Sequence, residues 1–188
     1  MKKYLTLHNV ILCCAAFVGL LFFGLSFAAK ASASVQGVSY VFNGSVWGSF
    51  SLTLEGGTTS INQALNVHSL FPLPMIGFIL LLVGTLAALC GGLLVKDEKI
   101  KKIVLLSCAG LVLVGGVFQF FNTENVYYAF QAAFAEDFAT VERVKQLFAE
   151  SGAKVSGGAL CIISGIFSIL AAGGIALVPF IKDKALTK

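Results

Sequence analysis

Lys96-Asp97-Glu98-Lys99-Ile100-Lys101-Lys102 is a charged stretch that separates two apolar blocks, Met75–Val95 and Ile103–Phe121. Each block is long enough to cross a lipid bilayer as a helix. Because two such blocks in succession suit a membrane hairpin and not a soluble core, we expect residues 96–102 to form the turn of that hairpin. Short loops rich in lysine stay in the cytoplasm, so the four lysines of this stretch predict a cytoplasmic turn.

The composition also indicates an integral membrane protein. Of the 188 residues, 57% are hydrophobic and only 12% are charged. Two further apolar blocks, Val10–Ala29 and Gly157–Ile181, raise the number of expected spans to four. The predicted fold is an all-α membrane protein: a four-transmembrane-helix bundle with a small extracellular β-hairpin and an external amphipathic helix, in one domain over residues 1–188.

The distribution of charge predicts the orientation of these spans. We expect both termini in the cytoplasm, residues 32–74 and 122–156 outside, and the protein in the cell membrane. The lysines of the expected cytoplasmic segments carry this prediction: Lys2, Lys3, Lys96, Lys99, Lys101, Lys102, Lys182, Lys184 and Lys188. The two external segments are net acidic, which argues against nucleic acid as a partner.

The first apolar block has a second interpretation. Lys2 and Lys3 before it, and the small residues around Ala29-Lys30-Ala31, are also typical of a cleaved secretory signal peptide. The run Val10–Ala29 is longer than the usual core of such a peptide and long enough to span a bilayer, so we favour a retained helix.

The first external segment, Ser32–Pro74, predicts a β-hairpin. Asn43-Gly44 is typical of a two-residue turn in which both residues have positive φ. The flanking strands would be Val38–Phe42 and Ser45–Leu54, since the second alternates apolar and polar residues at its end. A short helix is expected over Ser60–Ser69.

A turn at Asn43-Gly44 would place Tyr40 opposite Trp47 as an aromatic pair across the two strands. Aromatic side chains often act as anchors in protein interfaces. We therefore expect Tyr40, Phe42 and Trp47 to form an external surface that binds a partner.

The second external segment, Asn122–Ser156, has the apolar periodicity of a helix. We expect the third helix to continue outward to about Ala135 and a separate helix to span Phe138–Glu150, with Asp137 as its N-cap. The apolar face of this second helix is expected to cover the hairpin.

Two of the spans carry a face of small residues, which lets a neighbouring helix approach closely. On the second span these are Gly77, Gly84, Ala88 and Gly91. On the fourth span they are Cys161, Gly165, Ser168, Ala172 and Ala176. We expect both faces to be helix–helix contacts.

The sequence offers no constellation for catalysis. The expected spans carry no ionisable residue in their apolar cores, which argues against an ion-coupled carrier acting alone. His8 and His68 are expected near opposite membrane faces, so they would not share a site. The five cysteines have neither redox nor zinc spacing. We predict no enzyme activity, no catalytic residue, no cofactor and no metal.

The order of the expected parts resembles the claudin-like four-helix family. That family has cytoplasmic termini, a β-rich first external loop, a short cytoplasmic turn and a third helix that projects outward. Trp47-Gly48 is similar to the tryptophan motif of the family's first loop, whereas the paired cysteines that follow this motif are absent. The resemblance implies the arrangement of parts and does not extend to the family's adhesive function.

Two functions of different class agree with these features. The first is a non-enzymatic membrane scaffold or interaction protein, which presents its external hairpin and helix to a partner. The second is an accessory subunit of a membrane transporter or channel, which packs through its small-residue faces. Membrane lipid and another membrane protein, or a second copy of the chain, are the expected partners.

Overall fold

The computed structural model describes residues 6–25, 29–44, 50–55, 63–65, 72–134 and 136–181. This part of the chain is mostly helical and contains a small antiparallel sheet. Contacts divide the chain into two compact units. Unit 1 comprises Met1–Gly24, Ile76–Val117 and Ser164–Lys188, and unit 2 comprises Leu25–Met75 and Phe118–Ile163.

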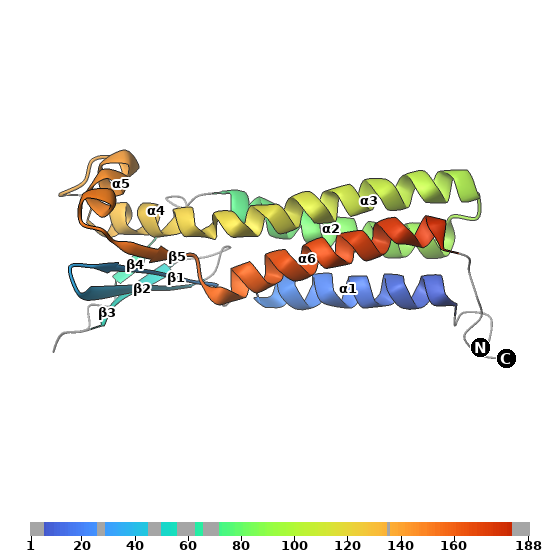
Figure 1. Cartoon of the computed structure of the whole chain (residues 1–188), viewed down its shortest axis with the longest axis horizontal. Coiled ribbons are helices and arrows are strands. Elements are labelled where there is room, and N and C mark those ends of the chain that lie inside the picture. Colours follow the sequence, from blue (N-terminus) through green and yellow to red (C-terminus); the bar gives the residue numbers. More distant parts are fainter. Residues whose placement is uncertain are drawn as a thin grey trace. The chain divides into compact units, whose positions relative to one another are not determined.

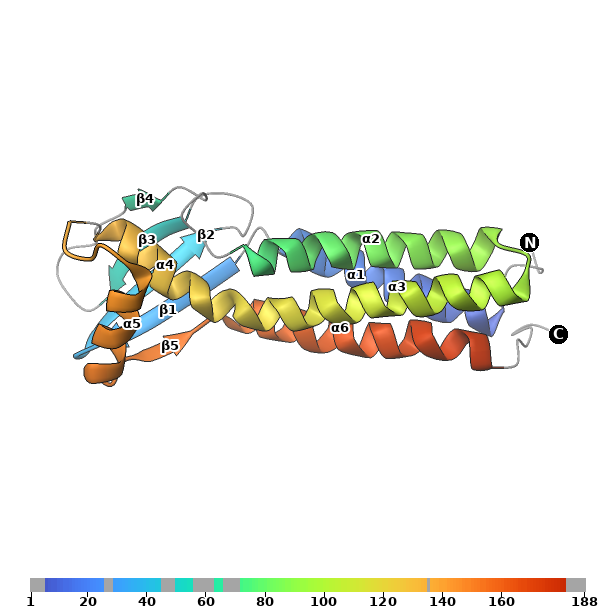
Figure 2. The same ribbon diagram turned by 90° about the horizontal axis from the view of Figure 1, so that it is seen from above.

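Unit 1 is a bundle of apolar helices that run side by side (Figures 1 and 2). The bundle contains most of α1 (Leu7–Leu25), α2 (Leu73–Leu94), α3 (Glu98–Gln119) and α6 (Ala159–Leu177), and it ends with the 3-10 turn η5 (Val178–Phe180). In both views the start of α1, the α2–α3 connection and η5 lie at one end of this bundle. We call it the lysine-rich end, after Lys96, Lys99, Lys101 and Lys102.

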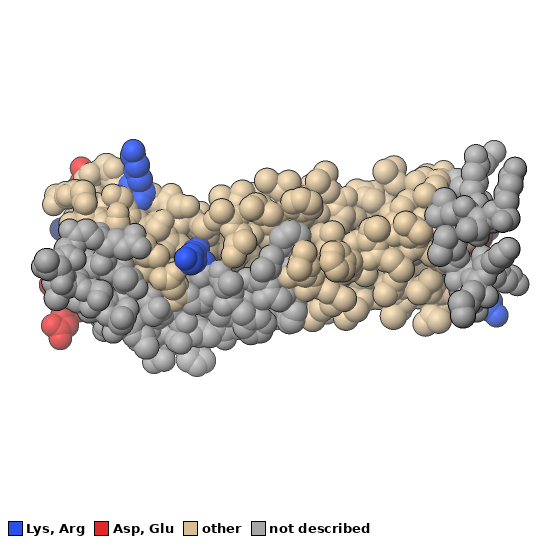
Figure 3. Space-filling view, turned by 90° about the horizontal axis from the view of Figure 1, so that it is seen from below, with Lys and Arg blue, Asp and Glu red and all other residues tan. Residues whose placement is uncertain are grey.

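Three helical segments are long and apolar enough to cross a membrane: Leu73–Leu94, Glu98–Ala133 and Ala159–Phe180. Large apolar side chains on the bundle point outward, since Phe17 is 66% exposed and Leu170 is 65% exposed. On the face shown in Figure 3, the described surface over the middle of the helices carries no charged side chain. Such a surface suits lipid and not water, and these features identify a membrane protein.

The α2–α3 connection is shorter than the predicted turn at 96–102. Only residues 95–97 lie outside the two helices, and α3 begins at Glu98. The Oδ1 atom of Asp97 accepts hydrogen bonds from the backbone N–H groups of Lys99 (2.8 Å) and Ile100 (3.0 Å). Asp97 therefore caps α3, and Lys99, Lys101 and Lys102 belong to its first turns.

Unit 2 contains a five-stranded antiparallel sheet with the order β4-β3-β2-β1-β5, where the sequence predicted a single hairpin. Its strands are β1 (Ala29–Val35), β2 (Val38–Gly44), β3 (Phe50–Glu55), β4 (Gln63–Leu65) and β5 (Lys154–Ser156). The first strand starts within the block predicted as the first span, because α1 ends at Leu25. The last strand comes from the segment that precedes α6 and pairs with β1.

The tight turn of the sheet lies at Gln36-Gly37 and not at Asn43-Gly44. Both Gln36 (φ 50°) and Gly37 (φ 82°) have positive φ, as a two-residue hairpin turn requires. Asn43 instead pairs with Lys30 on β1 and with Ser51 on β3. The ladders to β1 and β3 hold β2 extended through Gly44, and this pairing outweighs the local turn preference of Asn43-Gly44.

Two further predictions about this segment are corrected. Tyr40 lies opposite Ala33 and Leu54, so it does not pair with Trp47, which lies outside the described residues. The predicted helix over 60–69 is wrong where the structure describes it, because Gln63–Leu65 is strand β4 and pairs with β3.

The second polar segment forms two helices close to the predicted places. The third helix continues through η4 (Phe120–Thr123) into α4 (Glu124–Ala133), and α5 spans Val141–Glu150. The N-cap of α5 is Thr140, whose Oγ1 accepts a hydrogen bond from the backbone N–H of Arg143 (3.3 Å), and not Asp137. The backbone N–H groups of Asp137 and Phe138 both donate to the carbonyl oxygen of Phe134 (3.0 Å), so they belong to the turn that ends α4.

Helix α4 lies between the sheet and α5. The ring of Tyr40 on β2 packs against Phe130 and Phe134 of α4, with centroid distances of 5.2 and 6.2 Å. The ring of Phe148 on α5 lies 5.0 Å from the same Phe130 and 5.5 Å from Tyr127. The prediction that the second helix covers the hairpin is therefore corrected: α4 covers the sheet, and α5 covers α4.

Candidate functional site

The small-residue face of α2 is turned toward α3. A Cβ atom at Gly84 would lie 2.8 Å from the Val112 side chain of α3. A Cβ atom at Gly115 of α3 would lie 2.7 Å from the carbonyl oxygen of Gly77. Gly91 faces Val104 of α3 in the same way, and Ala88 is buried. The two backbones therefore approach so closely that a side chain would not fit between them.

The small-residue face of α6 contacts α3 as well. A Cβ atom at Gly116 of α3 would lie 2.9 Å from the Cβ atom of Ser168 and 3.1 Å from the carbonyl oxygen of Gly165. Cys161 and Ala172 are buried, and Ala176 is half-buried. Within unit 1, Gly77, Gly84 and Gly91 of α2 and Gly165 of α6 thus contact another helix of the same chain.

A third close contact, between α1 and α2, was not predicted from the sequence. A Cβ atom at Gly19 of α1 would collide with the side chain of Thr85, and one at Gly92 of α2 would collide with Leu12. Thr85 is buried, and its hydroxyl donates to the carbonyl oxygen of Leu81 (2.7 Å). The sequence signal that could have predicted this contact is Gly19, a glycine within the apolar helix α1.

The structure places the predicted partner-binding residues in the core of unit 2 where it describes them. Phe42 is fully buried, with 0% of its surface exposed, and Tyr40 packs against α4. Both side chains point to the α4 side of the sheet because residues two apart on a strand share a face. Neither is an exposed aromatic anchor, which corrects that expectation, and Trp47 lies outside the described residues.

On β1, β2 and β5 the opposite face of the sheet is mainly polar. The alternation of β1 and β2 that buries Ala31, Ala33 and Phe42 turns Ser32, Ser34 and Ser39 to the other side. Ser32 is also opposite Ser156 on β5, and Ser34 is opposite Lys154. A hollow of about 270 Å³ lies over this face, which we call the serine face: Ser32, Ser34, Ser39, Val41, Lys154 and Ser156.

A buried polar junction joins distant segments of unit 2. Asn122 in η4 is fully buried, and its Nδ2 group donates to the carbonyl oxygens of Gly157 and of Lys30 (3.4 Å). Its Oδ1 atom accepts a hydrogen bond from the side chain of Asn125 (2.9 Å). These bonds tie the start of β1 and the start of α6 to the α3–α4 junction, a role that no local sequence pattern signals.

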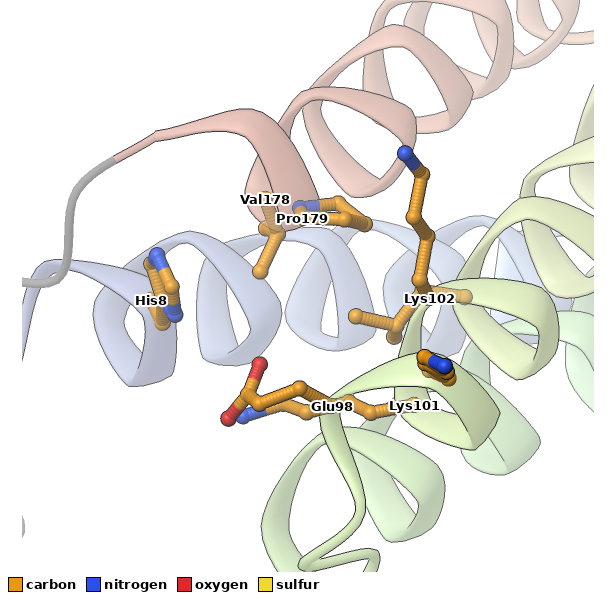
Figure 4. A pocket seen from close by; sticks show the side chains of 8 residues that line it. His8, Glu98, Lys101, Lys102, Val178 and Pro179 are labelled. Carbon is orange, nitrogen blue, oxygen red and sulfur yellow. The ribbon is translucent and has the colours of Figure 1, made fainter.

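The lysine-rich end of unit 1 contains a charged cavity of about 220 Å³ (Figure 4). His8 of α1, Glu98, Lys99, Lys101 and Lys102 of α3, and Pro179 of η5 form its walls. Two fully buried side chains, Leu105 and Val178, line its inner part. The sequence identified these lysines as a topology signal and did not reveal that they surround a cavity.

Two interactions fix the helix ends around this cavity. The Nε2 group of His8 donates a hydrogen bond to the carbonyl oxygen of Ile181 (2.8 Å), which joins the start of α1 to the chain after η5. The Nζ atom of Lys102 lies 4.3 Å from the ring centroid of Phe180, a cation–π contact. The cavity is thus built from segments far apart in the sequence.

Among the described residues, no group of three or more His, Cys, Asp or Glu side chains could hold a metal ion. The five cysteines are free: Cys108 and Cys161 are buried, and Cys13, Cys14 and Cys90 are exposed. No protein family matches this chain, and no curated protein matches it. Its function is therefore argued from the geometry.

Proposed function

We propose that this chain is a non-enzymatic membrane interaction protein, anchored by four spans and presenting unit 2 to a partner protein. The fourth span in addition to the three long ones is α1, an apolar helix of 19 residues. At about 1.5 Å per residue it is roughly 28 Å long, close to the thickness of the hydrocarbon core. The protein then resides in the cell membrane as a multi-pass protein.

The lysines of the lysine-rich end support an orientation with this end in the cytoplasm and the polar segments 32–74 and 122–156 outside. Cysteine labelling tests it in a variant whose native cysteines have been replaced. A membrane-impermeant maleimide added to intact cells should label Ser151→Cys, and it should label Glu98→Cys only after the membrane is opened. The reverse pattern contradicts the orientation, and labelling of both sites from outside contradicts the membrane anchoring.

The single observation that supports an interaction function is the serine face. One side of the sheet is packed on α4, whereas the other side keeps several small polar side chains and Lys154 around a hollow. A polar face on a sheet that is packed firmly on its other side offers hydrogen-bonding groups in fixed positions. A protein surface with complementary polar groups is the partner that this face suits.

Site-specific photocrosslinking tests this proposal in the native membrane. A photoreactive residue at Ser39, on the serine face, should give a discrete adduct with one partner. The same residue at Gln146, an exposed position on α5, is the matched control and should give none. With the purified partner, Ser39→Arg should weaken binding at least tenfold. Equal adducts from both positions, or unchanged affinity for Ser39→Arg, would contradict the proposal.

The alternative function, an accessory subunit of a transporter or channel, relies on the small-residue faces of the helices. In unit 1 the glycines of these faces already contact helices of the same chain. They are therefore not needed for a partner's helices, and we prefer the first function. Stable co-purification with a transporter in mild detergent would favour the alternative.

The claudin-like resemblance remains an analogy of architecture in this proposal. Its support is that the first polar segment is rich in strands, with β1–β4, and that the third helical segment continues to Ala133. An arrangement of parts does not carry a function with it. We therefore propose no adhesive activity.

A further inference from the structure

We propose that the charged cavity at the lysine-rich end binds the phosphate of an anionic lipid headgroup. This inference goes beyond the proposed partner function, because it concerns unit 1 and a different ligand. It depends only on the chain being embedded in a membrane. The same phosphate chemistry could come from a free anion, and the experiment below separates the two sources.

The cavity combines a cationic wall with an apolar interior. The cavity is lined by three lysines, Lys99, Lys101 and Lys102, and by one carboxylate, that of Glu98, which leaves a net charge of +2 with His8 neutral. Two fully buried apolar side chains, Leu105 and Val178, line the cavity as well. A phosphate ester has this same combination, with charged oxygens at one end and carbon at the other.

The lysines, and not the helix end, supply the attraction for an anion. The N-terminus of α3 would ordinarily offer free backbone N–H groups. Here the carboxylate of Asp97 already accepts from the N–H groups of Lys99 and Ile100. The positive charge available to a ligand is therefore that of the ammonium groups, each a point charge on a flexible stem.

The surroundings of the cavity indicate that the ligand is a lipid. An apolar side chain that contacts the cavity wall faces outward: Phe180 of η5 is 62% exposed. Phe180 also touches Lys102, so an exposed apolar ring and a cation of the cavity wall are in direct contact. An anionic lipid fits both features at once, with its phosphate among the lysines and an acyl chain along this exposed ring.

Binding to the full chain in detergent tests the proposal. Phosphatidylglycerol and phosphatidylcholine of equal chain length are titrated, and the bound lipid is counted by native mass spectrometry. We expect phosphatidylglycerol to bind at least tenfold more tightly. A lysine near a membrane surface contributes about a fivefold gain in affinity for anionic lipid, so Lys101→Gln and Lys102→Gln should each weaken phosphatidylglycerol binding about fivefold.

Two matched variants distinguish a cavity from diffuse surface charge. Lys96→Gln removes the same charge from the same end of the bundle, but Lys96 does not line the cavity, so its effect should be less than twofold. Glu98→Gln removes the one carboxylate of the wall and should tighten binding. Far-ultraviolet circular dichroism and melting in detergent should show that all four variants keep their fold.

Three outcomes would overturn the inference. Equal weakening by Lys96→Gln and Lys101→Gln would show that only the general charge of this end matters. Equal affinity for the two lipids would show that the cavity does not recognise the net negative charge of the headgroup. Finally, if inorganic phosphate displaced phosphatidylglycerol at equal concentration, the site would serve a free anion and not a lipid. None of these outcomes bears on the binding of a partner to unit 2, which is tested separately.

Discussion

Replacement of Phe148 by alanine should release α5 from unit 2 without unfolding the rest of the chain. Helix α5 has only ten residues, and a helix of that length is unstable alone in water. It is held to α4 by its two buried side chains, Val144 (0% exposed) and Phe148 (3% exposed). The Phe148 ring lies against both Phe130 and Tyr127 of α4.

The size of the effect follows from the burial of that ring. Truncation of a buried phenylalanine to alanine costs about 3–5 kcal/mol, and the lower end applies to a surface helix that can partly settle into the space. A loss of about 3 kcal/mol increases the equilibrium constant for opening of α5 by roughly 150-fold. The change should be largest in α5, because Phe148 packs directly on α4, and only Phe130 links it to Tyr40 of the sheet among these ring contacts.

Amide hydrogen exchange, measured by mass spectrometry on the full chain in detergent, detects such local opening. We expect peptides that cover α5 to exchange about a hundredfold faster in Phe148→Ala, or at the unprotected rate if the original protection is smaller. Peptides that cover α2 and α6 should be unchanged. Gln146→Ala on the exposed side of the same helix is the control, and its exchange should resemble that of the unmodified chain.

Two results would refute this reasoning. If α5 kept its protection in Phe148→Ala, its attachment would depend on contacts other than the aromatic cluster. If protection fell equally in α2 and α6, the two compact units would unfold together, and the division of the chain into separate units would be mistaken.

Three further predictions follow from the packing. Gly84→Leu should lower the melting temperature in detergent by several degrees, because its side chain would meet Val112, whereas Gly110→Leu, the same change at an open position, should not. Asn122→Ala removes the donor to the Lys30 and Gly157 carbonyl oxygens and should cost on the order of 1–3 kcal/mol, seen as faster exchange of β1 and β5. The hydrogen bond to Glu124 raises the pKa of Lys145 from its ordinary 10.5, so the pair contributes while Glu124 is ionised and Lys145 is charged, and this contribution is lost as pH rises through the raised value. The melting difference between the unmodified chain and Lys145→Gln should accordingly be constant between about pH 7 and pH 10 and shrink above that.

The long apolar helices could be predicted because their signal is local and large. A run of about twenty apolar residues has few alternatives to a membrane span. Helix α2 accordingly occupies Leu73–Leu94, close to the expected 75–95. The helix ends were less accurate, since they depend on single caps: α3 begins five residues before the predicted Ile103 because Asp97 caps it.

The sheet could not be predicted in the same way, because its pairings join distant segments. Two dipeptides in the first polar segment, Gln36-Gly37 and Asn43-Gly44, could form a tight turn, and the second is the better one by composition. What decides between them is β1, whose sequence of alanines and serines has little preference for a strand. Because β1 could not be recognised from the sequence, the extension of β2 through Gly44, which pairs with Ala29 of β1, could not be predicted either.

The charged cavity was missed for a similar reason. Its lysines belong to one short stretch of α3, so their number and spacing are visible in the sequence. The other walls come from His8 and from Val178 and Pro179, some 170 residues apart along the chain. Only the fold shows that these segments meet beside the lysines. Lysines that the sequence marks as an orientation signal therefore also line a candidate binding site.

Unit 1 and unit 2 are each stabilised internally by a different kind of contact. This difference indicates which solvent surrounds each unit. In unit 1 the closest contacts are made by small residues such as Gly84, Gly115 and Gly116. In lipid, apolar side chains gain little from leaving the solvent, so helices associate where their backbones can approach closely. In unit 2 the core is aromatic, with Tyr40, Phe130 and Phe148 in contact, and such rings stabilise a fold most when burial removes them from water. We therefore expect Phe148→Ala to destabilise unit 2 equally in detergents of different chain length, whereas the penalty of Gly84→Leu should change with the detergent. If both penalties changed alike, the two units would share one solvent, and unit 2 would not be the water-exposed surface on which the proposed function depends.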